Sequence, residues 1–154
     1  MKILTFLFAL LTLSLQSYGE NGMTRGERLV RTMGCNDCHS PGYAMTEGNL
    51  PKSQWLFGSP VGFMGPWGTS YPTNLRQRIY SLSEQDWVTY AQNLKTRPPM
   101  PYYDLKRASV DDLKAIYRFI RSLGDSKNIV PTALPPGEIP KTPYIDFNVK
   151  NMPL

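Results

Sequence analysis

The residues whose types and spacing point most directly to chemistry are Cys35 and Cys38, with His39 immediately after the second cysteine. A C-x-x-C-H run is typical of the covalent attachment of a c-type haem. Two thiols three residues apart at the end of a short helix can add to the two vinyl groups of one porphyrin, and the adjacent imidazole can bind the iron. The sequence therefore predicts one covalently bound haem c, with His39 as the proximal iron ligand.

Two other sites use similar residues. The chain has 2 cysteines and 1 histidine, so a structural zinc site would have at most three of its usual four nitrogen or sulfur ligands, all within five residues. A thioredoxin-type redox pair expects a βαβ setting, and the flanking residues show no alternating strand pattern. Both alternatives are disfavoured relative to haem.

The second axial position of the iron separates electron transfer from ligand chemistry. With a single histidine in the chain, a second histidine ligand is excluded, which leaves the methionines outside the leader: Met23, Met33, Met45, Met64, Met100 and Met152. Met100 is favoured as the distal ligand because prolines on both sides stiffen its segment and reduce the entropy lost on ordering it. Met64, in a Gly-rich loop, is the second choice. The alternative for Met100 is an ordinary gap-filling methionine of the core.

The N-terminus resembles a secretory signal peptide at residues 1–19. Lys2 supplies the charged start, Ile3 to Leu15 the apolar run, and Ser17 to Gly19 the small residues around a cleavage point. The apolar run is shorter than the about 20 residues that cross a bilayer as a helix. We therefore expect export, with an uncleaved leader that anchors the chain as the alternative.

Length and charge limit the remaining possibilities. The chain has 154 residues, enough for one domain with one core, which we place at residues 20–124. The formal net charge of +5 is too small to indicate nucleic-acid binding. Residues 125–154 form a Pro-rich extension, expected to be extended and either wrapped over the domain or partly free. Its prolines are at positions 131, 135, 136, 140, 143 and 153.

Start signals and apolar spacing predict three main helices. The first covers about 25–33 after a Thr24 and Glu27 capping box, the second covers about 84–95 after Ser83, and the third follows Ser109 and ends before Gly124. Residues 40–80 show no lasting periodicity and are expected to be an ordered loop that packs on the haem. Its candidate packing residues are Trp55, Phe57, Phe63 and Trp67.

The attachment motif, the Pro-Pro-Met-Pro segment at 98–101 and the final helix at 113–123 together resemble the class I cytochromes c. They are most similar to the haem domains in cytochrome subunits of membrane-associated dehydrogenases, over about residues 24–124. The resemblance implies an all-α fold of three to four short helices and long loops around one haem. It also implies Met100 as sixth ligand and a crossing of the first and last helices, with Gly26 and Val30 against Tyr117 and Ile120.

Two departures from those subunits stand out. They commonly carry three haems where this chain has one attachment motif, and the Pro-rich extension has no counterpart in the minimal domain. The resemblance also implies a periplasmic location, because such haem thioethers are formed outside the bacterial cytoplasm.

The expected function is therefore that of an exported mono-haem electron carrier and not an enzyme. Its redox partners would be proteins such as a periplasmic dehydrogenase or a terminal oxidase, with membrane association only through a partner or an uncleaved leader. The basic residues near the site would steer these encounters: Lys95, Arg97, Lys106 and Arg107. The alternatives are a haem-based ligand-binding or enzymatic domain with a labile sixth ligand, and a thiol–disulfide protein without haem.

Overall fold

The computed structural model describes residues 21–149, so the predicted signal peptide at 1–19 and residues 150–154 of the predicted extension lie outside it. The described chain forms α1 (Gly22–Thr32), α2 (Cys35–His39), β1 (Gly62–Gly65), β2 (Gly68–Ser70), α3 (Leu75–Tyr80), α4 (Glu84–Asn93), α5 (Tyr102–Arg107), α6 (Val110–Ser122) and β3 (Tyr144–Asp146). Two 3-10 turns, η1 (Ala44–Thr46) and η2 (Lys52–Gln54), follow α2. None of the helices within 21–149 is long and apolar enough to cross a membrane.

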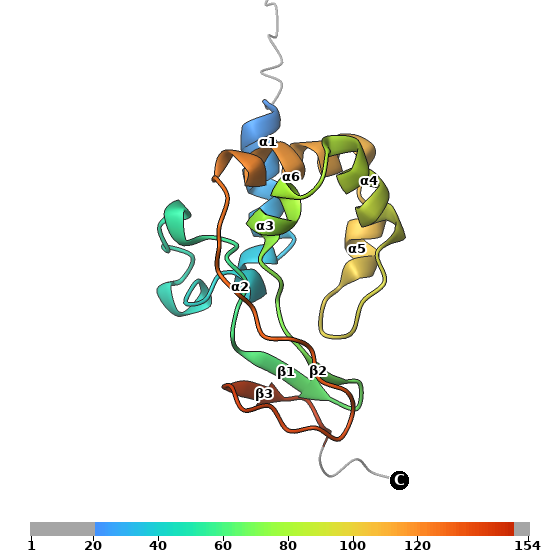
Figure 1. The fold of residues 1–154 in the computed structure, drawn as a ribbon. Helices are drawn as coiled ribbons and strands as arrows, with labels where there is room; N and C mark the ends of the chain where they lie inside the picture. Colours follow the sequence, from blue (N-terminus) through green and yellow to red (C-terminus); the bar gives the residue numbers. More distant parts are fainter. Residues whose placement is uncertain (1–20, 150–154) are drawn as a thin grey trace, which may run out of the picture.

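The prediction of an all-α fold of three to four helices is wrong. The described residues contain six α-helices and a three-stranded mixed sheet of order β2-β1-β3, in which β1 pairs antiparallel with β2 and parallel with β3. The helices gather at one end of the molecule and the sheet lies at the other (Figure 1). The first two strands are too short and too rich in glycine to show alternation, and the third comes from the Pro-rich extension through a pairing distant in sequence.

The closest helix contact is the crossing of α1 and α6 at Gly26. A Cβ atom on Gly26 would lie 2.1 Å from the Ala115 carbonyl oxygen and 2.6 Å from Phe119 Cβ. Val30, one turn further along α1, is fully buried together with the inner face of α6. The predicted crossing of the first and last helices at Gly26 is thus confirmed, although Gly26 itself meets Ala115 and Phe119.

Side-chain caps define where the main helices begin. Ser83 and Ser109 each accept a hydrogen bond from the amide three residues ahead, as their start signals predict. The first helix differs, because Asn21 caps it by accepting from the amides of Met23 and Thr24. The predicted start at Thr24 was therefore too late by one turn.

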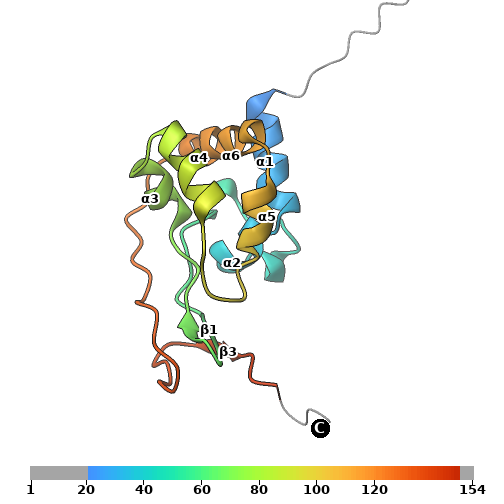
Figure 2. The ribbon, with the colours of Figure 1, turned by 90° about the vertical axis from the view of Figure 1, so that its right-hand side faces the viewer.

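The C-terminal extension runs back along the helices to the sheet (Figure 2). Asn74 donates to the carbonyl oxygens of Ser126 and Asn128 at 3.1 and 3.0 Å. Further on, the chain forms a bridge between Leu134 and Thr69, and β3 then pairs with β1. Over the described residues the extension is wrapped on the rest of the chain.

Replacing Gly26 with Ala should lower the free energy of unfolding by about 1–3 kcal/mol, because the added methyl group forces α1 and α6 apart. Gly22→Ala on the same helix is the matched control, since a Cβ there would meet only Arg118 Nη1 at 4.0 Å. Denaturant titration of both variants measures the difference. Equal stability of the two variants would contradict the close crossing.

Stability should also depend on pH through Asp112, in the first turn of α6. The Ser109 hydroxyl, and beside it Arg25, hold the pKa of this carboxyl below its usual value. Its contribution is therefore present above the unfolded-state pKa of about 3.9 and is lost as the pH falls through the lower folded-state pKa. Asp112→Asn should cost about 1 kcal/mol near neutral pH.

Chemical denaturation at several pH values tests this expectation. The stability difference between the wild type and Asp112→Asn should shrink towards zero in acid. Asp111→Asn removes the same charge from an exposed neighbour in the same turn and should show less of this dependence. A difference that stays constant down to about pH 2 would contradict the assignment.

Candidate functional site

The attachment motif forms α2, which follows α1 after a single sharp turn. Gly34 joins the two helices in the left-handed conformation (φ 69°), which glycine adopts without strain. Cys35 then begins α2 and packs against the hydrophobic core, while Cys38 and His39 lie at its C-terminal end. The position of the motif is thus set by where α1 ends.

His39 is held at both its ring and its backbone. Its Nδ1 donates to the Thr73 carbonyl oxygen at 2.7 Å, and its own carbonyl oxygen accepts from the Gly58 amide at 2.9 Å. The residue is 6% exposed, and burial lowers the pKa of the imidazole, which keeps the ring neutral at neutral pH. Because Nδ1 carries the proton, Nε2 has a free lone pair and no hydrogen-bond partner among the described residues. A ring fixed through one nitrogen to a carbonyl is the arrangement of a metal-binding histidine.

The loops that hold His39 are themselves tied together by Arg76. This guanidinium is buried and donates to the carbonyl oxygens of Trp55, Lys52, Ser53 and Leu123 at 2.6–3.2 Å. The Leu56 carbonyl also accepts from the amides of Leu75 and Arg76. The segment at 52–57 is therefore fixed beside the start of α3, which positions Gly58 and Thr73 around His39.

His39 lines a cavity of about 410 Å³, within the range of small-molecule and cofactor sites. Cys38 and Met100 line the same cavity, whereas Cys35 lies one turn earlier on α2 and is not among the lining residues. The apolar part of the wall is made by Phe63, Leu75, Trp87, Tyr90, Leu94 and Leu105. The cavity thus brings together three of the four residues predicted to hold the cofactor.

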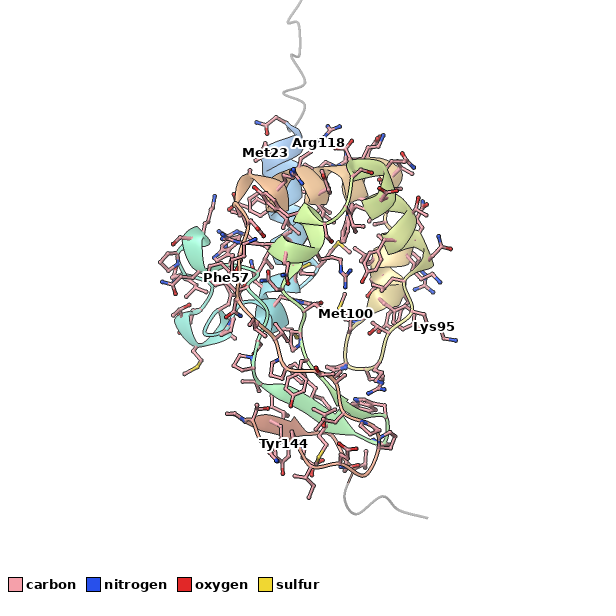
Figure 3. All side chains as sticks on the ribbon, in the orientation of Figure 1. Met23, Phe57, Lys95, Met100, Arg118 and Tyr144 are labelled. Atoms are coloured by element: carbon pink, nitrogen blue, oxygen red, sulfur yellow. The ribbon has the colours of Figure 1, made fainter. Side chains whose placement is uncertain are left out.

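The two candidate methionines lie in different places. Met100 lies in the loop that joins α4 to α5 and lines the cavity, with Lys95 on the outer edge of the same loop (Figure 3). Met64 lies in the middle of β1, where its carbonyl oxygen accepts from the Phe147 amide, and it does not line the cavity. Met100 thus shares a cavity with His39, and Met64 does not.

The cavity wall carries positive charge. Arg78, Lys95 and Arg97 line it, and none of the described lining residues is acidic. The Arg78 guanidinium lies over the Tyr90 ring, 5.3 Å from its centroid, and forms no ion pair with a described residue. An apolar cavity with unpaired cations suits a planar apolar group that carries carboxylates.

The environment of the two thiols differs from that of a redox-active cysteine pair. Both cysteines are free. Burial raises the pKa of the Cys35 thiol to about 12, and burial followed by the Asp37 carboxylate raises the pKa of Cys38. Redox-active C-x-x-C pairs instead have a cysteine of lowered pKa. The environment therefore disfavours thiolate chemistry at neutral pH.

Only one of the four aromatic residues expected to pack on the haem lines the cavity, and that residue is Phe63. Trp55 is fully buried between Tyr43 and Phe119, Phe57 lies under the Arg76 guanidinium, and Trp67 packs on Phe147. Sequence reasoning missed most of the other lining residues, among them the large side chains Tyr71, Arg78, Trp87 and Tyr90. Of these, Trp87 has a signal in the sequence, because it lies at helical spacing with Ala91 and Leu94.

The residues present fit a covalent haem. Two thiols on α2, a neutral imidazole with a free nitrogen, a thioether and cations gather at or next to one cavity. No family model matches the chain, and searches of curated proteins and of solved structures find no significant similarity.

Arg76→Lys should lower the free energy of unfolding by about 2–3 kcal/mol. A lysine keeps the charge but cannot reach all the carbonyl oxygens that the guanidinium satisfies, so buried acceptors lose their donors. Arg107→Lys, whose nearest carboxylate is 3.9 Å away on an exposed surface, should change stability by less than about 0.5 kcal/mol. Denaturant titration compares the two, and similar small losses would contradict the buried role of Arg76.

Proposed function

We propose that the chain is an exported mono-haem c-type cytochrome that transfers single electrons between redox proteins. The observation that carries the proposal is the arrangement of His39. Its ring is fixed to Thr73 through Nδ1, and it lines a cavity together with the attachment cysteine Cys38 and the thioether of Met100. Few functions other than haem attachment use this combination.

Each residue has a distinct task in this proposal. Cys35 and Cys38 would form the thioether bonds, and His39 would bind the iron through Nε2. Met100 would bind the iron through its sulfur. When bound, the group supplies an iron that changes between its ferrous and ferric states. Two neutral ligands that stay in place keep reorganisation small, and a thioether raises the potential relative to two imidazoles.

The wall of the cavity supports the same assignment. Trp87, Leu94 and Leu105 provide an apolar surface that excludes water. Arg78, which has no acidic partner among the described residues, is the cation that we assign to the carboxylates of the group. The cavity would thus match the haem both in apolar surface and in charge.

The proposed partners are redox proteins, and the proposed location is the periplasm. Lys95 and Arg97 line the cavity and are exposed, so they offer positive charge close to the site. Such charge accelerates the encounter with an acidic partner surface. We propose no substrate chemistry, because the two axial positions would both be filled by side chains.

The visible absorption spectrum of Met100→Ala tests the ligand assignment. The wild type should be low-spin in both oxidation states and bind almost no carbon monoxide when reduced. Met100→Ala should become accessible and bind about one equivalent of carbon monoxide, because the second axial position is opened. Met64→Ala is the matched control and should keep the wild-type spectrum.

The mass of the denatured protein tests the cofactor itself, since thioether-linked haem survives unfolding. A mass without haem and alkylation of both cysteines would overturn the proposal in favour of a thiol protein. A resting wild-type iron that is high-spin and binds carbon monoxide readily would favour a ligand-binding or enzymatic haem domain. If the spectrum changes in Met64→Ala and stays unchanged in Met100→Ala, the iron ligand would be Met64 in β1.

A further inference from the structure

The segment that carries Met100 has little internal structure of its own. It joins the end of α4 at Asn93 to the start of α5 at Tyr102. Two of its residues before Met100 are prolines, and none of the amides from Lys95 to Met100 donates to a backbone oxygen in the described chain. The Met100 carbonyl accepts from the Tyr102 amide at 2.9 Å. The conformation of this loop must therefore be fixed from outside.

Two external hydrogen bonds reach the loop just before Met100. The Ser70 hydroxyl at the end of β2 donates to the Pro98 carbonyl oxygen at 2.7 Å. Arg97 Nη1 donates to the Leu134 carbonyl oxygen, also at 2.7 Å. The second bond connects the loop to the C-terminal extension, a segment 37 residues away in sequence.

Leu134 is a firm anchor because it is itself held at both backbone groups. Its carbonyl oxygen accepts from the Thr69 amide at 3.0 Å, and its amide donates to the Thr69 carbonyl at 2.9 Å. The extension lies directly on Gly68, where a Cβ would be 2.2 Å from the Leu134 carbonyl oxygen. The Leu134 carbonyl thus receives a second, charge-assisted bond from Arg97 in addition to its bridge to β2.

We propose that the C-terminal extension is a positioning element for the distal ligand: Leu134, through Arg97, holds the Met100 loop closed over the cavity. The proposal rests on the proposed function, because it assumes that Met100 binds the iron. A thioether must compete with any external ligand. Its advantage depends on the fraction of molecules in which the loop is already in its closed conformation.

Binding of imidazole to the ferric holoprotein measures this competition. Arg97→Gln should raise the apparent imidazole affinity about tenfold. This factor corresponds to the loss of one charge-assisted hydrogen bond that stabilises the closed loop. Gly68→Ala, whose added Cβ would lie 2.2 Å from the Leu134 carbonyl oxygen, changes no residue of the loop and should act in the same direction. Lys106→Gln removes one positive charge from the exposed face of α5 and should leave the affinity within about twofold of the wild type.

Repeating the Arg97→Gln substitution in the Met100→Ala variant distinguishes an effect on the position of Met100 from a general effect of charge or stability. In Met100→Ala the thioether is absent, so adding Arg97→Gln should leave imidazole affinity unchanged. An unchanged affinity in Arg97→Gln alone, or an equal increase in both backgrounds, would overturn the positioning proposal. Gly68→Ala need not fold for this test to stand, since Arg97→Gln and the double variant decide it.

The failure of the proposed function is distinguishable from the failure of this inference. A protein without covalent haem, or one in which Met100→Ala leaves the spectrum unchanged, removes the premise and overturns both. The role of the extension alone is overturned if the wild type is low-spin and Met100→Ala binds carbon monoxide, but Arg97→Gln leaves the imidazole affinity unchanged.

Discussion

The close crossing of α1 and α6 at Gly26 is the contact on which the rest of the structure depends. Because α1 leads through Gly34 directly into α2, the crossing sets where the cysteines and His39 lie. The helix α6 also holds α4, because the Trp87 indole donates to the Leu113 carbonyl at 2.8 Å. The loop that carries Met100 starts at the end of α4. One helix pair therefore positions the two elements that carry His39 and Met100, which line the same cavity.

The segment at 40–57 has little regular secondary structure, and side chains satisfy several of its backbone groups. Arg76 donates to the carbonyls of Lys52, Ser53 and Trp55. The Ser40 hydroxyl accepts from the buried Leu56 amide at 2.7 Å. The same hydroxyl donates to the side-chain Oδ1 of Asn36 at 2.8 Å. Buried polar groups that are paired in this way fix one loop conformation. A rigid loop can then hold an imidazole at a defined angle.

Sequence reasoning identified the residues with local signals and missed those that depend on distant contacts. The C-x-x-C-H motif and the caps at Ser83 and Ser109 each have a signal within a few residues, whereas the crossing at Gly26 was implied by the resemblance. The helices α3 and α5 are six residues long, too short to show a period of 3.6. The strand β3 forms only because the extension folds back onto β1. The convergence of His39 and Met100 on one cavity likewise follows from packing, although their residue types suggested it.

The charge of the cavity bears on the direction of electron flow in the proposed cytochrome. Cations near a redox centre stabilise its less positive state, so Arg78, Lys95 and Arg97 would favour the ferrous form in the same sense as a thioether ligand. The carboxylates of the group oppose this, and pairing with Arg78 would neutralise part of their effect. Lys95 and Arg97 would then retain a net positive field at the exposed mouth. Such a centre is suited to accept electrons from a donor of lower potential, and the same two residues would attract an acidic partner surface.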